Sequence, residues 1–384
     1  MKWAQTNLGN CCCVFAGFAF KSNEFSSNPD DIALVKGENV GQGRVLWEIS
    51  KFWPRAKTDG LARYRLAPGD IVLAMDRPWV PAGLKYAWIQ EHDPEALLVQ
   101  RVARIRANRG VDQRFLHFVI GSKAFSDYIQ NSTRGVSVPH ISGRQIEEYQ
   151  FPLPSFAEQA KIGSILAAYD NLMENNRRRM GLLEEAARQL YREWFVRLRF
   201  PGHHHGKIAK GIPEGWERTP LENAMVLQRG FDLPVQDRQS GTVPIYGSTG
   251  INGYHNEAKV SGPGIVTGRS GTLGEVRFVR ENFWPLNTAL WVKEFRRVSP
   301  LFALFLLQSI DLKQYNGGVS VPTLDRKSVH KIEILIPASS FLAAFDQFVS
   351  PLFAQVANLN AQNHHLRTAR DLLLPRLMSG EIAV

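Results

Sequence analysis

Cationic, polar and aromatic side chains cluster near residues 53–88, where turn residues interrupt short apolar runs. Arg and Lys can form paired hydrogen bonds with guanine, and Asn or Gln can do so with adenine. The same cations can neutralise phosphates, which position a protein on DNA without specifying a sequence. We therefore predict DNA contacts in this region, from Arg55, Lys57, Arg77, Lys85 and Tyr86.

A second cluster surrounds residues 246–250 (YGSTG), which we expect to form an exposed loop with a flexible backbone. Arg77 and Arg269 follow similar strand-like runs, which sets them apart from other arginines. A single tryptophan is more often a core residue, and a single arginine is more often merely solvated, so we expect contacts from the set rather than from every member. The residues predicted here are Tyr246, Ser248, Thr249, Asn252, Tyr254, Arg269 and Ser270.

Motifs for catalysis are missing from the sequence. An adenine methyltransferase needs an Asn-Pro-Pro-aromatic motif that holds the flipped base. A P-loop needs GxxxxGK followed by Ser or Thr, and a hydrolase elbow needs GxSxG. Residues 257–259 (EAK) could end a nuclease motif, although a solvated loop is the simpler interpretation. We predict no catalytic residues in this chain.

Cysteines and histidines occur in two short runs. Cys11, Cys12 and Cys13 are adjacent, a spacing that suits neither a disulfide framework nor a zinc finger. We interpret them as small apolar residues of a buried strand in a reducing compartment. Residues 203–205 are three histidines between glycines, which favours a flexible linker over a metal site. We predict no metal site.

The chain has 46 Lys and Arg against 36 Asp and Glu, a net charge of +10. A basic excess favours a polyanionic partner, although a merely basic protein is an alternative. No apolar run reaches about 18 residues, so we expect no membrane contact. Polar residues near the start, such as Gln5 and Asn7, interrupt any signal-peptide core, and we expect a cytoplasmic protein.

The sequence repeats itself. Residues 3–8 recur at 216–221, 17–20 at 230–233, and 134–139 (RGVSVP) at 317–322 (GGVSVP). Repetition of this kind indicates two copies of one supersecondary unit. We therefore predict an α+β fold with two mixed α/β domains, each followed by a helix. The predicted segments are domain 1 (1–153), helix 1 (154–200), a linker (201–212), domain 2 (213–336) and helix 2 (337–384).

Both helical segments carry an apolar seam with steps of three and four residues. A sustained heptad seam of this type predicts a coiled coil, here antiparallel. One asparagine interrupts each seam, Asn176 in the first and Asn363 in the second, and a buried asparagine can fix the register. The alternative is that each helix packs on its own globular domain.

Several motifs resemble the specificity subunits of type I restriction-modification systems. They are VSVP at 136–139 and 319–322, each followed by a Pro-terminated apolar stretch, and the C-terminal RDLLLPRLMSGEI at 370–382. The resemblance covers essentially the whole chain, in the right order, twice. From these motifs we add Arg134, Ser137 and Ser320 to the predicted DNA-contacting residues.

The resemblance implies that each domain reads one half of a split, asymmetric site in double-stranded DNA. It implies an antiparallel coiled coil that spaces two domains related by pseudo-twofold symmetry. The implied partners are two methyltransferase subunits, which methylate adenine with S-adenosylmethionine, and restriction subunits that use ATP and Mg. This chain itself is expected to bind no cofactor.

One departure concerns docking of the partners. The first helix begins with Glu158 and Gln159, whereas the second lacks this pair, so docking there can differ. Two other hypotheses stay open: a non-enzymatic coiled-coil scaffold for protein or RNA partners, and a fused nuclease. A scaffold would bind its target alone, whereas a type I subunit should be encoded beside a methyltransferase subunit and bind poorly without it.

Overall fold

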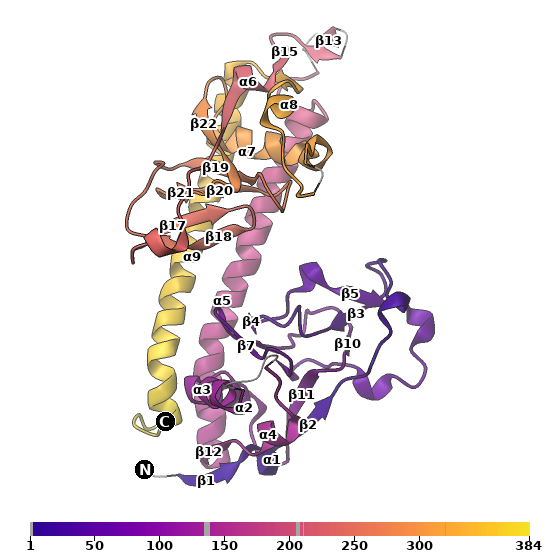
Figure 1. Ribbon diagram of the computed structural model, residues 1–384, viewed down its shortest axis with the longest axis vertical. Coiled ribbons are helices and arrows are strands. Elements are labelled where there is room, and N and C mark those ends of the chain that lie inside the picture. Colours follow the sequence, from indigo (N-terminus) through magenta and orange to yellow (C-terminus); the bar gives the residue numbers. More distant parts are fainter. Residues whose placement is uncertain (1–2, 134–138, 205–207, 210, 319) are drawn as a thin grey trace. The chain divides into compact units, whose positions relative to one another are not determined.

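The structure, a computed structural model, describes residues 3–133, 139–204, 208–209, 211–318 and 320–384. The chain divides into two compact units. Unit 1 contains residues 1–175 and 361–384, and unit 2 contains residues 176–360. Each unit therefore combines a globular segment with one part of each long helix (Figure 1). The domain boundaries predicted from the sequence blocks stay predictions.

Unit 1 is built on a five-stranded sheet with the order β2–β11–β6–β9–β4. In β6, Ile71 and Leu73 pack on one face of the sheet, and Val72 and Ala74 pack on the other. A three-stranded sheet has the order β10–β3–β5, and β1 pairs with β12. The bounds are β1 Ala4–Asn7, β2 Cys12–Ala16, β3 Ile32–Val35, β4 Gln42–Gly43, β5 Lys51–Trp53, β6 Ile71–Ala74, β7 Trp79–Val80, β8 Gly83–Leu84, β9 Tyr86–Trp88, β10 Ala96–Leu98, β11 Val102–Ala107 and β12 Gln150–Leu153.

Unit 2 contains a four-stranded sheet with the order β16–β22–β19–β20, a three-stranded sheet with the order β18–β17–β21, and the pair β15–β23. A small hairpin, β13–β14, lies at the predicted linker. The bounds are β13 Ile208–Ala209, β14 Ile212–Pro213, β15 Glu217–Pro220, β16 Met225–Arg229, β17 Val243–Gly247, β18 Gly250–His255, β19 Gly264–Gly268, β20 Val276–Val279, β21 Trp284–Pro285, β22 Ala289–Phe295 and β23 Glu333–Ile336.

The two units share one strand topology. Seven strands of each unit correspond one to one in chain order. They are β2, β3, β5, β6, β9, β10 and β11 in unit 1, and β16 through β22 in unit 2. Each pair of neighbours also runs in the same relative direction: β3–β10 and β17–β21 are parallel, and the others are antiparallel. The predicted internal repeat is therefore confirmed.

A repeated glycine has a packing reason. A Cβ on Gly17 would lie 2.3 Å from the carbonyl oxygen of Val99, and a Cβ on Gly230 would lie 2.2 Å from that of Leu286. Both obstacles are backbone atoms, which cannot rotate away as a flexible side chain can. Glycine is therefore required in each unit where the chain leaves β2 or β16.

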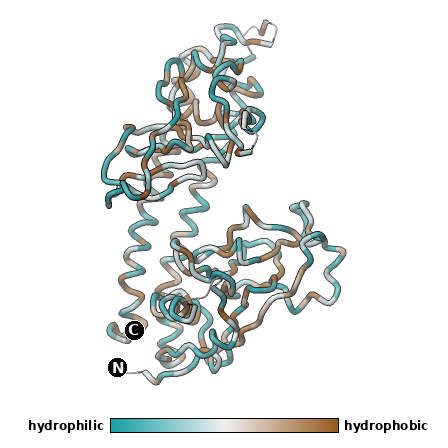
Figure 2. Tube along the Cα trace, in the orientation of Figure 1, coloured by the Kyte–Doolittle hydropathy of each residue, from teal (hydrophilic) through white to brown (hydrophobic). Residues whose placement is uncertain are grey.

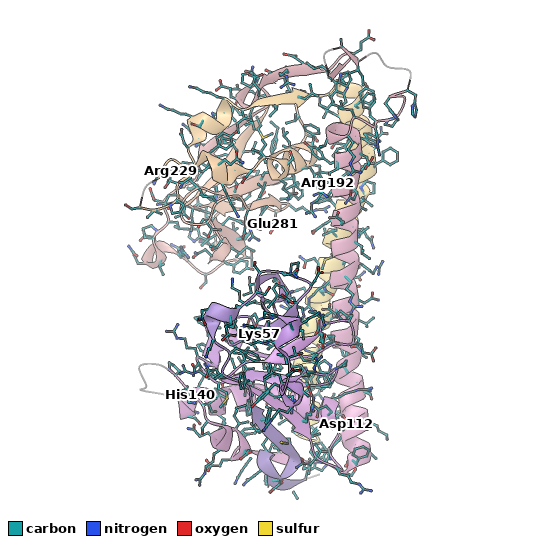
Figure 3. The ribbon with its side chains drawn as sticks, turned by 90° about the vertical axis from the view of Figure 1, so that its right-hand side faces the viewer. Lys57, Asp112, His140, Arg192, Arg229 and Glu281 are labelled. Carbon is teal, nitrogen blue, oxygen red and sulfur yellow. The ribbon has the colours of Figure 1, made fainter. Side chains whose placement is uncertain are left out.

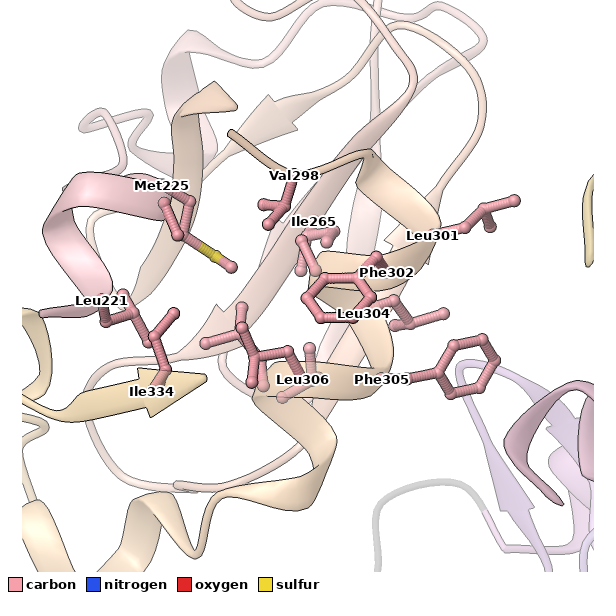
Figure 4. Packing of buried hydrophobic residues seen from close by; sticks show 14 of the residues in the cluster. Leu221, Met225, Ile265, Val298, Leu301, Phe302, Leu304, Phe305, Leu306 and Ile334 are labelled. Atoms are coloured by element: carbon pink, nitrogen blue, oxygen red, sulfur yellow. The ribbon is translucent and has the colours of Figure 1, made fainter. Parts of the chain in front are cut away.

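Short helices cover the sheets. α2 begins after Asp112, whose carboxylate accepts a hydrogen bond from the Phe115 amide, and α7 begins after Ser299, which caps Phe302 in the same way. Apolar residues of α7 face Ile265 of β19 and the neighbouring strands in the core of unit 2 (Figure 4). The bounds are α1 Leu8–Cys11, α2 Gln113–Ile120, α3 Lys123–Ser132, α4 Gly143–Glu147, α6 Leu221–Ala224, α7 Pro300–Ser309 and α8 Arg326–His330.

Two long helices, α5 (Phe156–Tyr191) and α9 (Ser339–Met378), contribute to both units. In unit 1, Leu377 of α9 joins the cluster that contains Ile162 and Leu166 of α5. In unit 2, Phe345 of α9 joins the cluster that contains Tyr191. Further along the pair in unit 1, Asp170 bonds to Arg370 and Met173 accepts from Asn363, so rising numbers on α5 meet falling numbers on α9. The helices are therefore antiparallel there, as the predicted coiled coil requires. Hydrophilic and hydrophobic residues alternate along both helices (Figure 2).

Both seam asparagines are buried, each 7% exposed. The amide of Asn363 donates from Nδ2 to the carbonyl oxygen of Met173 at 3.2 Å, within unit 1. That contact gives the asparagine a polar partner at its own level of the seam, as a residue that fixes the register requires. Their role in setting the register stays a prediction.

The cysteine run differs in part from the prediction. Cys11 ends α1 and Cys12 begins β2, and both are buried, but Cys13 is exposed because successive strand residues face opposite sides. Burial raises the pKa of the Cys12 thiol to about 12. Among the described residues there is no cluster of three or more His, Cys, Asp or Glu that could hold a metal ion, and no helix long and apolar enough to cross a membrane.

Candidate nucleic-acid interface

The proline that ends each VSVP motif is hydrogen-bonded to the end of a strand, and the two strands are equivalent. In unit 1, the amide of Arg77 donates to the carbonyl oxygen of Pro139 at 2.7 Å, and that of Ile141 donates to Met75 at 2.9 Å. In unit 2, Gly271 donates to Pro322 at 2.9 Å, and Leu324 donates to Arg269 at 2.8 Å. We call this element the strand-end junction: residues 75–77 with 139–141 in unit 1, and 269–271 with 322–324 in unit 2.

This hydrogen-bond pattern aligns the two junctions residue by residue. Arg77 and Arg269 follow equivalent strands, but Arg77 corresponds to Gly271, and Arg269 corresponds to Met75. Arg77 has φ +43° and Gly271 has φ +87°, so both lie in the left-handed region. That conformation costs a non-glycine residue about 1–2 kcal/mol. Strain of this kind persists where the surrounding structure imposes it, often at functional positions.

Asp76 fixes the unit 1 junction. Its carboxylate bonds to Nδ1 of His140 and to the guanidinium of Arg101, both at 2.6 Å. Partial burial acts to raise the pKa of Asp76, but these two partners outweigh it, and the pKa is lowered. The Arg77 side chain is exposed beside this cluster and has no ion pair among the described residues. His140 is labelled on unit 1 in Figure 3.

A cleft borders the junction proline in each unit. In unit 2 it has a volume of about 550 Å³, and its lining includes Lys313, Asn316 and Pro322 together with residues 271–275. In unit 1 it has a volume of about 210 Å³ and is lined by Trp79, Gln130, Thr133 and Pro139. Equivalent elements of both units thus border an open hollow whose lining mixes polar and apolar side chains.

Four predicted residues of unit 1 have partners within the protein. Arg55 pairs with Glu95 at 2.7 Å and Lys57 with Glu24 at 2.8 Å. Lys85 donates to the carbonyl oxygen of Gly37, and burial lowers its pKa. Tyr86 is half-buried and packs against His117 with ring centroids 5.4 Å apart, and burial raises its pKa to about 12. Its role as a DNA contact stays a prediction.

Tyr246 in unit 2 requires a correction. It is 8% exposed, lies within β17 and packs edge-on against Phe283, so residues 246–250 are not the exposed loop expected. Burial raises its pKa to about 12. In the turn from β17 to β18, Ser248 is half-buried and Thr249 is exposed. Apolar residues of neighbouring strands bury the Tyr246 ring. The Gly- and Ser-containing sequence around it gave no sign of this burial.

Other predicted residues of unit 2 lie on its surface. The side-chain oxygen of Asn252 accepts from Arg238 at 3.1 Å, and Tyr254 is 55% exposed on β18. Arg269 donates to the carbonyl oxygen of Asn287 at 3.2 Å. Ser270 belongs to the junction, where its backbone bridges to Thr323, and Ser320 is exposed shortly before Pro322. Arg134 and Ser137 lie outside the described residues. As DNA contacts, all of these stay predictions.

Sequence reasoning missed Lys313 and His140, which border the two junctions. Neither belongs to a repeated motif or to a basic cluster. An alignment of the two repeats around the VSVP motifs could have pointed to His140, since it directly follows Pro139. Nothing in the sequence pointed to Lys313, because it reaches the cleft from a distant segment, residues 312–315.

Comparison with known proteins gives consistent matches. The family model described as type I restriction modification DNA specificity domain matches residues 2–185 and 213–349. Similar proteins are specificity subunits of type I restriction enzymes: HindI of Haemophilus influenzae (36% identical over 471 aligned positions, 99% of each chain), EcoBI of Escherichia coli (25% over 427 positions, 99% of this chain and 86% of that one) and MjaIX of Methanocaldococcus jannaschii (27% over 303 positions, 72% and 70%).

A solved structure shares the fold. The crystal structure of the type I restriction-modification S subunit from M. genitalium is 14% identical in sequence. The match has a TM-score of 0.56 and covers 98% of this chain and 96% of that one.

Proposed function

Since this chain belongs to the family of DNA specificity subunits of type I restriction-modification systems, we propose that it recognises a split DNA site, with each unit reading one half. The observation that carries this proposal is the shared topology. Both units carry the same strand order, and in both the proline of the VSVP motif is hydrogen-bonded to the end of the equivalent strand. Two equivalent recognition elements within one chain suit two half-sites better than one continuous site.

The chain is a non-catalytic subunit, so the chemistry belongs to its partners. We propose that two methyltransferase subunits bind it and methylate adenine at N6 with S-adenosylmethionine. Restriction subunits that need ATP and Mg are proposed as further partners, and the cytoplasm as the location. No cofactor is assigned to this chain.

Exposed apolar residues on the long helices support protein docking there. Leu172 and Leu182 of α5 are more than half exposed, as are Phe348 and Leu372 of α9. Large apolar side chains that stay exposed on the long helices are candidate contacts for a protein partner. The helices are therefore the proposed binding surface for the methyltransferase subunits.

The proposed function is tested by co-expressing this chain with its neighbouring methyltransferase subunit in a host that lacks adenine methylation. Single-molecule sequencing then reads the methylated positions. We expect N6-methyladenine on both strands of one split motif, whose halves lie about one helical turn apart. The control is the methyltransferase subunit expressed alone, which should leave the DNA unmethylated. Unmethylated DNA from a soluble, co-purifying complex would favour a scaffold instead.

A further inference from the structure

Unit 1 carries five residues that we name the aromatic–arginine patch: Phe15, Phe18, Arg63, Tyr64 and Arg104. The guanidinium of Arg63 lies 4.7 Å from the ring centre of Phe15 and 5.4 Å from that of Tyr64. Arg104 lies 4.8 Å from the same Phe15 ring. The Tyr64 ring contacts those of Phe15 and Phe18 at 5.5 and 5.2 Å. Two cations thus share one aromatic surface.

The patch is fixed by hydrogen bonds. Nη1 of Arg104 donates to the carbonyl oxygen of Arg63 at 2.9 Å and to that of Arg65 at 3.2 Å. These bonds hold the short helix that carries Arg63, residues 62–64, against β11. The position of the Arg63 backbone is therefore set by the fold, and its side chain is confined by two rings.

The charge of the patch is not balanced. Nearby carboxylates are already paired, Asp70 with Arg106 and Glu95 with Arg65. Among the described residues, neither Arg63 nor Arg104 has an ion pair, and Arg63 is exposed. Burial lowers the pKa of Arg104, and the positive charges of Arg106 and Arg63 add to that effect. A cluster of crowded cations with a free guanidinium favours an anionic ligand.

The patch lies next to the unit 1 junction. The amide of Phe18 donates to the carbonyl oxygen of Leu98 at 3.0 Å, and that of Gln100 donates to Phe18 at 2.7 Å. The next residue, Arg101, pairs with Asp76 of the junction at 2.6 Å. Residues 98–101 therefore connect the patch to the junction.

We propose that the aromatic–arginine patch binds a phosphate of the DNA backbone, with Arg63 as the contacting group. The proposal rests on the proposed function and assigns one specific phosphate-contacting residue to it. A planar guanidinium that is stacked on rings offers several donors in a fixed arrangement, which suits a phosphate. The patch is not repeated in unit 2, because strand pairing puts Gln228 where unit 1 has Phe15 and Trp291 where it has Arg104. The aromatic–arginine patch would therefore contact the DNA at one half-site only.

The test compares Arg63→Gln with wild type in the complex with the methyltransferase subunit. Binding is measured by fluorescence anisotropy between 50 and 200 mM salt, on a duplex with the motif and on a scrambled duplex of equal length. We expect Arg63→Gln to weaken binding about tenfold on both duplexes and to reduce the salt slope by about 1. Arg63→Lys keeps the charge but loses the planar guanidinium. Its affinity for DNA should lie between those of wild type and Arg63→Gln.

The matched control is Arg144→Gln. The Arg144 side chain is 87% exposed and pairs with Glu148 at the end of α4. Its substitution by Gln removes the same charge as Arg63→Gln, but outside the patch. Its salt slope should equal that of wild type. An unchanged slope for Arg63→Gln would overturn the phosphate contact, and so would a loss confined to the motif duplex, which would indicate base reading. In either case wild-type methylation of a split motif would leave the proposed function standing.

Discussion

Gly230→Ala is expected to lower the stability of unit 2 by about 3 kcal/mol, the upper part of the usual range for overpacking. The added methyl group would lie 2.2 Å from the carbonyl oxygen of Leu286 and 2.5 Å from that of Pro285. This backbone cannot yield freely, since the Leu286 amide donates to Tyr246 at 2.7 Å and Pro285 pairs with β17. For a unit of this size, the loss corresponds to a fall in Tm of roughly 10 °C.

Gly181→Ala is the matched control for this substitution. Gly181 lies within α5 in the same unit, and its Cβ would meet nothing within 4 Å. Alanine has the higher helix propensity by about 1 kcal/mol, so Tm should stay or rise. Differential scanning calorimetry of the full chain makes the comparison, with Gly17→Ala as the unit 1 counterpart of Gly230→Ala. Equal Tm values for the Gly230 and Gly181 variants would show that the close approach is not required.

Asp170→Asn is expected to destabilise unit 1 by about 3 kcal/mol, because it leaves the partly buried guanidinium of Arg370 with only the exposed carboxylate of Asp371 as a partner. Asp170 lies on α5, where one carboxylate oxygen bonds to Arg370 of α9 and the other lies 3.8 Å from Nε2 of His117 on α2. The carboxylate therefore contacts side chains of two other helices of unit 1. Urea unfolding at pH 7, followed by tryptophan fluorescence, measures the loss.

The effect of Asp170 depends on pH. Burial acts to raise the pKa of Asp170, but His117 and Arg370 outweigh it, so the folded pKa lies below the ordinary value of about 3.9. The stabilisation is therefore complete above that value and is lost as the pH falls through the folded pKa. The difference between wild type and Asp170→Asn should be constant from pH 7 to 5 and shrink below about pH 4.

Asp371→Asn is the control for Asp170→Asn. Asp371 pairs with the same arginine at 2.7 Å, but its side chain is 53% exposed. Exposed pairs contribute up to about 1 kcal/mol. If both variants lost the same stability, or if the loss for Asp170→Asn were independent of pH, the helix-joining role of Asp170 would be wrong.

The repeat and the coiled coil could be predicted from the sequence, because both depend on spacing. Gly17 and Gly230 mark the same close approach, and the seam through Ile162 and Leu166 follows the helical period. The match of Arg77 to Gly271 also follows from spacing, because residues 68–73 resemble residues 262–267 and the same offset places Arg77 opposite Gly271. The hydrogen bonds that tie these strand ends to the prolines of the VSVP motifs could not be predicted, because they join segments far apart in the sequence.

Burial and pairing of single side chains were also beyond the sequence. Tyr246 belongs to an apolar cluster whose other members come from strands distant in the sequence. The Gly and Ser residues next to it suggested an exposed loop, and that prediction was wrong. Arg55 is paired with Glu95, a residue 40 positions away. Local composition identifies candidates for DNA contact, but long-range packing decides which of them remain free.

The central claim is that each unit reads its own half-site, and an exchange of one globular segment tests it most directly. Residues 1–153 would be replaced by the corresponding segment of another specificity subunit, which keeps the pairing of β1 with β12 inside the exchanged piece. The methylated motif of the hybrid, co-expressed with the methyltransferase subunit, is then sequenced. We predict that one half of the motif changes while the other half stays the same. A change in both halves would contradict the account.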